Sequence, residues 1–283
     1  MKFPKYWAKE THQVTNPEGK TISFGCWRWS DASHAEARQW AKTSAQEIAW
    51  KIADKQKLDR YSYGERPLRE EVVQVVKDGG NRELAIVTRN AYGALVLNAA
   101  NAMFIDIDFQ DGGIGSVVTK VRKLFDKTVL TEEDKHIQSV EQWAQGYPDL
   151  GIRIYRTYGG LRCLVVNYVF DPTQESTMGM LQSLNSDPLY IKLCRRQECF
   201  RARLTPKPWR CGGDKPPSRY PWEDSESERR YRRWEEDYKR ISSEYTVCRL
   251  VKQIGRNELH PDIQPVLSVH DQMSCTDPDL ELA

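Results

Sequence analysis

The chain has 283 residues, of which 39% are hydrophobic, 10% aromatic and 29% charged, with a net charge of +2. A chain of this length can bury a sizeable core without disulfides, as one large or two smaller domains, and its aromatic content argues against disorder. The apolar runs are far shorter than the ~20 residues of a membrane span, so we expect no membrane partner, and the nearly balanced charge indicates no other class of partner.

The N-terminus and the cysteines both predict a cytoplasmic protein. Met1–Trp7 places two charges and a proline where a signal peptide needs an apolar stretch. The seven cysteines are an odd number without a Cys-x-x-Cys pair, so we expect reduced thiols. The spacing of Cys194, Cys199 and Cys211 matches no usual zinc site.

Residues 1–80 are predicted to form an N-terminal strand–helix module. Strand formers fill 21–29, and Ser33 and Glu36 then stand at the spacing of a capping box. Apolar residues recur every three or four positions from 32 to 57, which predicts an amphipathic helix.

Residues 81–283 form the predicted core, beginning with three short apolar runs that indicate a meander of strands, at 84–88, 94–98 and 102–109. The next predicted elements are helices at 116–126 and 132–145, a hairpin at 152–169, helices at 172–184 and 188–197, and a strand at 199–204. From residue 103 onward the order is β–α–β–β–α–β. We therefore expect an α+β fold with an RRM-like (ferredoxin-like) sheet covered on one face by two helices.

The C-terminal part is predicted to contain a Pro- and Gly-rich loop at 205–221, a charged helix at 226–241, and strands at 245–251 and 266–270. These segments would close the core around the Arg-rich stretch that precedes them.

Two carboxylates interrupt the otherwise apolar strand Phe104–Phe109. Asp106 and Asp108 are two residues apart, so both project from one face of a strand. Neighbouring carboxylates repel each other, and a divalent cation such as Mg²⁺ or Mn²⁺ removes that repulsion. Two-metal phosphoryl-transfer centres are commonly built in this way. The alternative is a solvated strand face.

A Gly-Gly turn between two predicted strands carries basic residues at its mouth. Gly159 and Gly160 would let the backbone approach a ligand closely, and Arg156, Thr157 and Arg162 lie beside them. Guanidinium groups match phosphate oxygens, so these five residues are candidates for binding a nucleotide. The alternative is an ordinary hairpin whose arginines pair with surface acids.

The segment 195–220 combines eight basic residues with two acidic ones and interleaved aromatic rings. Basic side chains with aromatic stacking surfaces suit single-stranded nucleic acid. The candidate contacts are Arg201, Arg203, Lys207, Trp209 and Arg210. The alternative is pairing of these arginines with the acids of 223–237.

The predicted strand 266–270 ends in His270 and is followed by Asp271. An imidazole and a carboxylate at a strand end are both metal-ligand types, and they would complete the centre begun by Asp106 and Asp108. The alternative is a capping aspartate beside a surface histidine.

The runs Phe104–Phe109 and Arg156–Arg162 resemble the catalytic core of the archaeo-eukaryotic primase and primase-polymerase superfamily, whose pattern the chain follows in outline over about residues 100–271. The resemblance implies an RRM-like βαββαβ core, with Asp106 and Asp108 as metal ligands and Asp271, by its order along the chain, as the third acid. Arg162 stands where the family usually has a nucleotide-contacting histidine. The chain also resembles a bacterial family around 63–71 and 201–210, and this second resemblance implies no function.

These observations predict a metal-dependent nucleotidyl- or phosphoryl-transfer protein that acts on nucleic acid and nucleoside triphosphates, with Mg²⁺ or Mn²⁺ as cofactor. Two alternatives remain open. One is a non-catalytic nucleic-acid-binding module that uses 195–220, and the other is a metal-dependent nuclease that uses the same acids.

Overall fold

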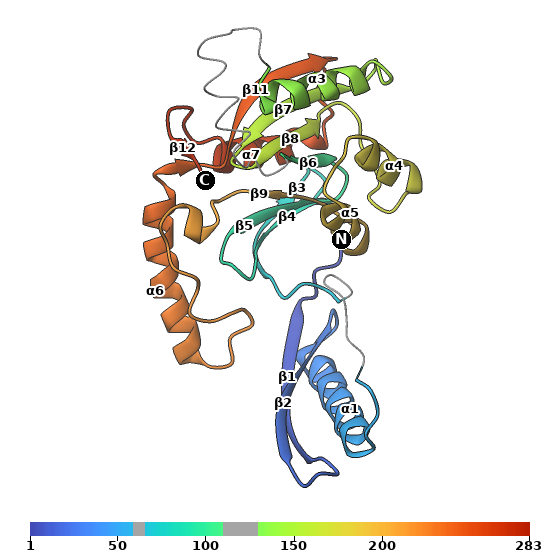
Figure 1. Ribbon diagram of the computed structural model, residues 1–283, viewed down its shortest axis with the longest axis vertical. Helices are drawn as coiled ribbons and strands as arrows, with labels where there is room; N and C mark the ends of the chain where they lie inside the picture. The colour runs from blue at the N-terminus through green and yellow to red at the C-terminus, as the bar shows by residue number, and fades with distance from the viewer. Residues whose placement is uncertain (59–65, 110–129) are drawn as a thin grey trace.

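The computed structural model describes residues 1–58, 66–109 and 130–283. The chain folds as an α+β protein with an N-terminal arm and two four-stranded antiparallel sheets (Figure 1). The α+β class predicted from the sequence is confirmed. The helix expected at 116–126 lies outside the described residues.

The arm consists of the hairpin β1 (Tyr6–Thr15) and β2 (Thr21–Ser30) with helix α1 (His34–Ala53) packed against it. The amphipathic helix is confirmed, and Ser33 caps it by accepting a hydrogen bond from the Glu36 amide at 3.1 Å. Strand β1 was not predicted, because most of its residues are polar. It forms because it pairs with β2 over its whole length.

The first core sheet has the strand order β3-β4-β5-β9, built from β3 (Glu71–Lys77), β4 (Glu83–Arg89), β5 (Leu95–Ala99) and β9 (Phe200–Arg203). The module boundary expected at residue 80 therefore falls in the turn of the β3–β4 hairpin, where the Asp78 amide donates to the Arg82 carbonyl.

The second core sheet has the order β11-β7-β8-β6, built from β11 (Cys248–Gly255), β7 (Gly151–Thr157), β8 (Gly160–Val165) and β6 (Phe104–Asp108). The predicted meander is wrong at its last step, because β6 pairs with β8 and not with β5. The predicted single βαββαβ sheet does not form either. Its expected last strand, β9, pairs with β5, where Leu97 and Ala202 lie opposite each other in the core.

The helices cover these sheets. They are α3 (Glu132–Ala144), α4 (Glu175–Ser183), α5 (Pro188–Gln197), α6 (Ser225–Ser242) and α7 (Ile263–Ser274), with a 3-10 turn, η1, at Pro208–Arg210. The short strands β10 (Tyr245–Thr246) and β12 (Glu281–Leu282) pair in parallel near the C-terminus.

Helix α7 replaces the strand predicted at 266–270. Its buried residues recur at helical spacing, at Ile263, Val266, Leu267, His270 and Ser274. The apolar run has the composition of a strand. A helix forms because it packs this face against β3 and β4 of one sheet and places His270 against Phe104 and Tyr155 of the other. In Figure 1, α3 and α7 cover opposite faces of the β11-β7-β8-β6 sheet.

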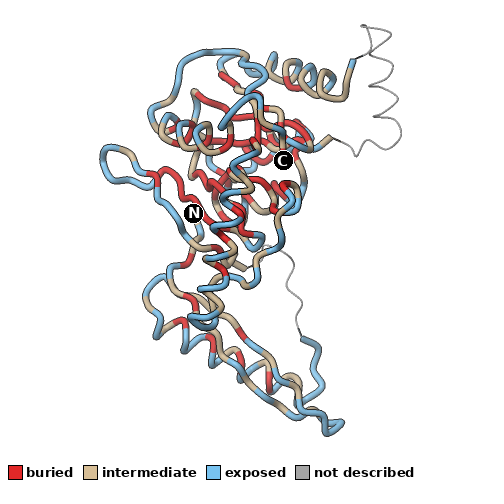
Figure 2. The backbone as a smooth tube through the Cα atoms, turned by 90° about the vertical axis from the view of Figure 1, so that its left-hand side faces the viewer, coloured by how far each residue is buried: buried red, intermediate tan, exposed pale blue. Residues whose placement is uncertain are grey.

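The core lies in and between the two sheets, and the arm contributes little to it. The fully buried large side chains include Tyr155, Phe104, Phe200 and Leu97, which come from both sheets. Figure 2 shows buried backbone concentrated in this region, with mostly exposed or intermediate backbone along the arm.

Candidate functional site

The two acids of β6 lie on one face of the second sheet. Ile105 and Ile107 are buried on the opposite face, whereas Asp106 and Asp108 are more exposed. In the register with β8, Asp106 lies opposite Arg162 and Asp108 lies opposite Gly160. The acids thus lie beside the hairpin that carries Gly160 and Arg162.

A third carboxylate, that of Asp187 at the start of α5, lies near enough to act electrostatically on Asp108. Asp187 caps α5 by accepting from the Leu189 amide at 2.9 Å, and its own amide donates to the Asp106 carbonyl at 3.3 Å. Burial, followed by the carboxylates of Asp106 and Asp187, raises the pKa of Asp108. The sequence analysis missed Asp187, because an Asp-Pro pair before a helix is the ordinary signature of a helix start.

Arg162 connects the acids to the rest of the site. Its side chain is buried, and its Nε lies 4.0 Å from Asp106 Oδ1. Its Nη1 donates to the Arg203 carbonyl at 2.9 Å and lies 3.3 Å from His270 Nε2. Because a guanidinium only donates, His270 Nε2 must accept, and the imidazole carries its proton on Nδ1.

Three further basic side chains surround the acids without ion pairs to them. Arg203, Lys207 and Arg210 interact electrostatically with Asp106, but among the described residues none has a carboxylate oxygen within 4.0 Å. Arg203 Nη1 is buried and has no hydrogen-bond partner in the described part of the chain.

The surroundings of these cations shift their pKa values. Burial, together with the nearby cations Arg162 and Arg210, lowers the pKa of Arg203 to about 10. Burial also lowers the pKa of Lys207 and of Arg210. An arrangement of clustered cations without pairing acids can bind the oxygens of an anionic group such as phosphate.

His270 and Asp271 do not extend the acid cluster. Asp271 accepts from Arg153 Nη1, from the Tyr155 hydroxyl and from His270 Nδ1, each at 2.9 Å. His270 is fully buried between the rings of Phe104 and Tyr155. Through His270, the pair therefore positions the Arg162 guanidinium. The hydrogen bonds of His270 and Asp271 do not go to Asp106 or Asp108, with which they were predicted to form a metal centre.

Another group of metal-ligand types lies beside this pair. One atom each of His270, Asp271 and Cys275 lies within 4.8 Å of the others, and Cys248 Sγ is 3.4 Å from Cys275 Sγ. The imidazole nitrogens already bond to Asp271 and Arg162, so this group is a hydrogen-bonded cluster behind the site.

Two predicted basic contacts face elsewhere. Arg201 forms a buried ion pair with Glu70 at 2.8 Å and is not available to nucleic acid, so that prediction is wrong. Arg156 pairs with Glu133 of α3 at 3.3 Å and stacks on Phe109, on the sheet face opposite to Asp106. Its guanidinium holds the hairpin turn by donating to the carbonyl of Gly160 at 2.9 Å.

The glycines of the turn have different roles. A Cβ atom on Gly160 would lie 2.0 Å from the Ile107 carbonyl oxygen, so only glycine allows β8 to approach β6 this closely. At Gly159 the nearest atom to such a Cβ would be Arg210 Nη2 at 4.0 Å. Thr157 is buried at the end of β7 and faces the interior.

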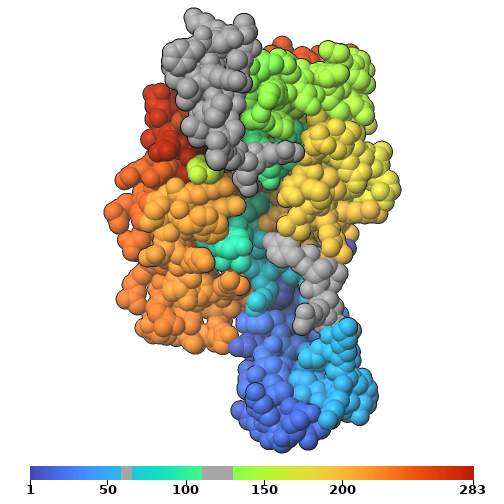
Figure 3. All heavy atoms as spheres, viewed as in Figure 1, coloured from blue at the N-terminus to red at the C-terminus, as the bar shows by residue number. Residues whose placement is uncertain are grey.

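The surface is hollowed between two groups of elements of the core. Figure 3 shows a recessed band of strand residues between the lobe of α4 and α5 and the lobe that holds residues 203–240. Asp187 comes from the first lobe, and Lys207 and Arg210 come from the second. The site therefore combines residues from both core sheets and from α5.

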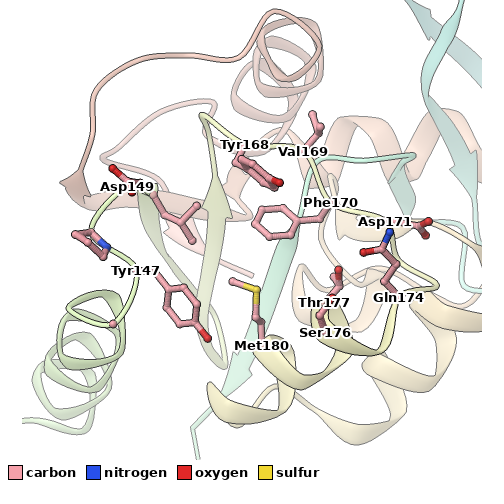
Figure 4. A pocket seen from close by; sticks show the side chains of 13 residues that line it. Tyr147, Asp149, Tyr168, Val169, Phe170, Asp171, Gln174, Ser176, Thr177 and Met180 are labelled. Atoms are coloured by element: carbon pink, nitrogen blue, oxygen red, sulfur yellow. The ribbon is translucent and has the colours of Figure 1, made fainter.

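An apolar pocket of about 720 Å³ lies at the other end of the same sheet. Its walls come from the segments before β7 and after β8, with Tyr147, Tyr168, Phe170 and Met180 pointing into it (Figure 4). The acids lie beside the opposite end of these strands, near Gly160, so the pocket is separate from the site.

Comparisons of the chain with protein-family models, with curated proteins and with solved structures give no match. Among residues 1–58, 66–109 and 130–283, no helix has both the length and the apolar composition needed to cross a membrane.

Proposed function

We propose that the protein is a metal-dependent nucleotidyl transferase that acts on nucleic acid, similar to the primase-polymerases. The observation that carries the proposal is that Asp106 and Asp108, with Asp187 nearby, lie beside Arg162 and beside three basic side chains, Arg203, Lys207 and Arg210, that form no ion pair with a described carboxylate. Carboxylates that hold divalent cations, beside cations that hold phosphates, are the parts that phosphoryl transfer requires.

The three carboxylates suit a hard divalent cation. Asp108 has no ion-pair partner among the described residues, and its neighbours Asp106 and Asp187 raise its pKa, so a cation would relieve their repulsion. Asp106 and Asp108, with Asp187 in the place expected for Asp271, would hold Mg²⁺ or Mn²⁺. When bound, the metal would stabilise the charge that develops on the phosphoryl oxygens.

The basic residues would bind and orient the triphosphate. Arg162 contacts His270, and the Nη1 of Arg203 lacks a partner among the residues that the structure describes; both guanidinium groups interact with Asp106. In the transfer, a nucleic-acid hydroxyl oxygen bonds to the α-phosphorus, its proton passes to solvent, and pyrophosphate leaves. These fixed cations would stabilise the charge on the departing pyrophosphate.

The fold and the cysteines are compatible with this proposal. In a βαββαβ core the first strand lies beside the third and the third beside the second, and β6, β8 and β7 follow this order. We propose an RRM-like origin for this part of the sheet, although its fourth strand lies elsewhere. The seven cysteines are all free, which suits a cytoplasmic location.

The test is incorporation of a labelled nucleoside triphosphate into nucleic acid, on single-stranded templates with Mn²⁺ or Mg²⁺. We expect incorporation by the unaltered protein and a loss of about 100-fold or more in Asp106→Asn, because several kcal/mol of charge stabilisation disappear. Asp237→Asn, at an exposed acid of α6, is the matched control and should retain full activity.

The two alternatives have distinct outcomes in the same experiment. Metal-dependent shortening of the nucleic acid without incorporation would replace the proposal by the nuclease. Binding that is indifferent to EDTA and to Asp106→Asn, without turnover, would replace it by the binding module. Equal incorporation by Asp106→Asn and the unaltered protein would refute the role of the acids.

A further inference from the structure

Three large aromatic side chains beside the acid–cation cluster are exposed to solvent. Tyr92, Trp209 and Tyr158 have exposed fractions of 47%, 46% and 52%. They come from the β4–β5 turn, from η1 and from the β7–β8 turn, so three separate segments bring them together. We call these three residues the aromatic platform.

Basic side chains are interleaved with the rings of the platform. The rings of Tyr92 and Trp209 meet edge to face, with centroids 5.1 Å apart. Lys207 Nζ lies 5.7 Å from the Trp209 ring centroid, and the Arg210 guanidinium lies 4.1 Å above the Tyr158 ring. The same two cations act electrostatically on Asp108, which places the platform next to the acids.

The segments that carry Tyr92 and Trp209 are held firmly. Asn90 Oδ1 accepts from the amides of Tyr92 and Ala94 at 2.9 and 3.1 Å. Gly93 has a φ of +85°, and a Cβ there would meet the Trp234 ring at 2.1 Å, so this turn is fixed against α6.

The turn that carries Trp209 is equally constrained. Its buried Pro208 accepts from the amide of Gly213 at 2.8 Å. In Figure 3 the β4–β5 turn lies against this segment on the wall of the hollow. Exposed rings that are fixed in place lose little entropy when a planar group stacks on them.

We propose that the aromatic platform binds unpaired bases of a single-stranded nucleic acid and leads that strand to Asp106 and Asp108. The inference rests on the proposed function, and it specifies the form of the nucleic acid. Bases stack on exposed aromatic rings independently of sequence, while Lys207 and Arg210 complement the phosphates. In a duplex the faces of the bases are already stacked, so a duplex cannot occupy the platform in this way.

The test measures the affinity for a fluorescently labelled single-stranded oligonucleotide in EDTA, so that no metal-dependent step contributes. Trp209→Ala and Tyr92→Ala should each weaken binding by about 5- to 150-fold, the loss of one stacked base. Trp40→Ala is the matched control, because Trp40 is 51% exposed but lies on α1 of the arm, and it should bind normally. Unchanged thermal midpoints would show that the variants fold.

Two further measurements sharpen this result. Lys207→Gln should reduce the slope of log affinity against log salt by about one, as expected for one lost phosphate contact. A duplex of the same sequence should bind more weakly than the single strand and be insensitive to Trp209→Ala. Two results would refute the platform. One is equal single-strand affinity of Trp209→Ala and the unaltered protein, and the other is a loss of duplex affinity in Trp209→Ala as large as the loss of single-strand affinity.

Failure of the platform and failure of the transferase activity can be told apart. Asp106→Asn should bind the single strand in EDTA at least as tightly as the unaltered protein, because it removes a negative charge near Lys207 and Arg210. Platform-dependent binding without any nucleotide incorporation would support the platform and reject nucleotidyl transfer. Incorporation with single-strand binding that is indifferent to Trp209→Ala and Tyr92→Ala would reject the platform alone.

Discussion

Arg162 is the residue through which most of the site is connected. It reaches Asp106 on one side and His270 on the other, and it also donates to the backbone of β9 in the other sheet. Asp271 fixes the tautomer of His270, and His270 fixes the guanidinium. A lysine here would retain the charge but lose this fork of fixed donors.

Asp108 gives the clearest prediction about pH. Burial and the two neighbouring carboxylates raise its pKa in the folded protein. The folded state thus binds this proton more tightly than the unfolded chain does. The stability that this contributes is complete below the unfolded pKa of about 4 and is lost as the pH rises through the folded pKa.

Asp108→Asn should therefore raise the thermal midpoint of the protein in EDTA at pH 7, and the gain should shrink toward pH 4. The same variant should lose any rise in the midpoint that Mn²⁺ gives the unaltered protein. Asp224→Asn is the control and should lower the thermal midpoint at pH 7, because the hydrogen bond from the Ser227 amide lowers the pKa of the Asp224 carboxyl in the folded protein. A midpoint of Asp108→Asn below that of the unaltered protein at pH 7 would contradict the prediction.

The contact between β6 and β8 determines how closely the acids and the hairpin approach each other. Gly160 lies directly opposite Asp108, and its missing side chain leaves room for the Ile107 carbonyl. The close approach is thus a property of two strands together and of neither strand alone.

Two glycine substitutions test this. Gly160→Ala should destabilise the protein by several kcal/mol, because its Cβ would meet backbone that cannot move aside without separating the strands. Gly179→Ala, within α4 and with no atom within 4 Å of its Cβ, should stabilise by about 0.5–1 kcal/mol. Urea unfolding of both variants measures the difference, and similar stabilities would show that the β6–β8 contact is looser than described.

The molecule joins a well-packed core to a weakly packed arm. Every buried residue of α1 is an alanine, at positions 37, 41, 45 and 49. Alanine methyl groups remove little apolar surface from water compared with the Ile263, Val266 and Leu267 that α7 buries in the core. The contacts between the arm and the rest of the chain include the Lys9–Glu223 ion pair at 2.6 Å and the stacking of Arg69 on Trp27.

Hydrogen exchange should therefore divide the molecule into two parts. Amides of α1 should open with a free energy at least about 1.4 kcal/mol below that of α7, a tenfold difference in exchange. Because both helices belong to the same chain, their amides are compared under identical conditions. Equal protection of α1 and α7 would mean that the arm and the core unfold as one cooperative unit.

Local patterns in the sequence were sufficient for several features. The alternation in Phe104–Phe109 placed Asp106 and Asp108 on one face, and the Gly-Gly turn predicted the β7–β8 hairpin. Helical spacing predicted α1, α3 and α5, and the run of charged residues predicted α6. These features depend on residues a few positions apart, whose relative geometry the backbone periods of 2.0 and 3.6 already define.

Contacts between distant segments could not be deduced in this way. The sequence predictions were wrong about the partner of β9, which pairs with β5, and about 266–270, which belongs to a helix, and they did not include Asp187 near the acids. Strand pairing and helix packing follow from apolar surface buried between segments more than a hundred residues apart, as for Leu97 against Ala202. Such burial is a property of the whole folded chain, because no local period records which surfaces will meet.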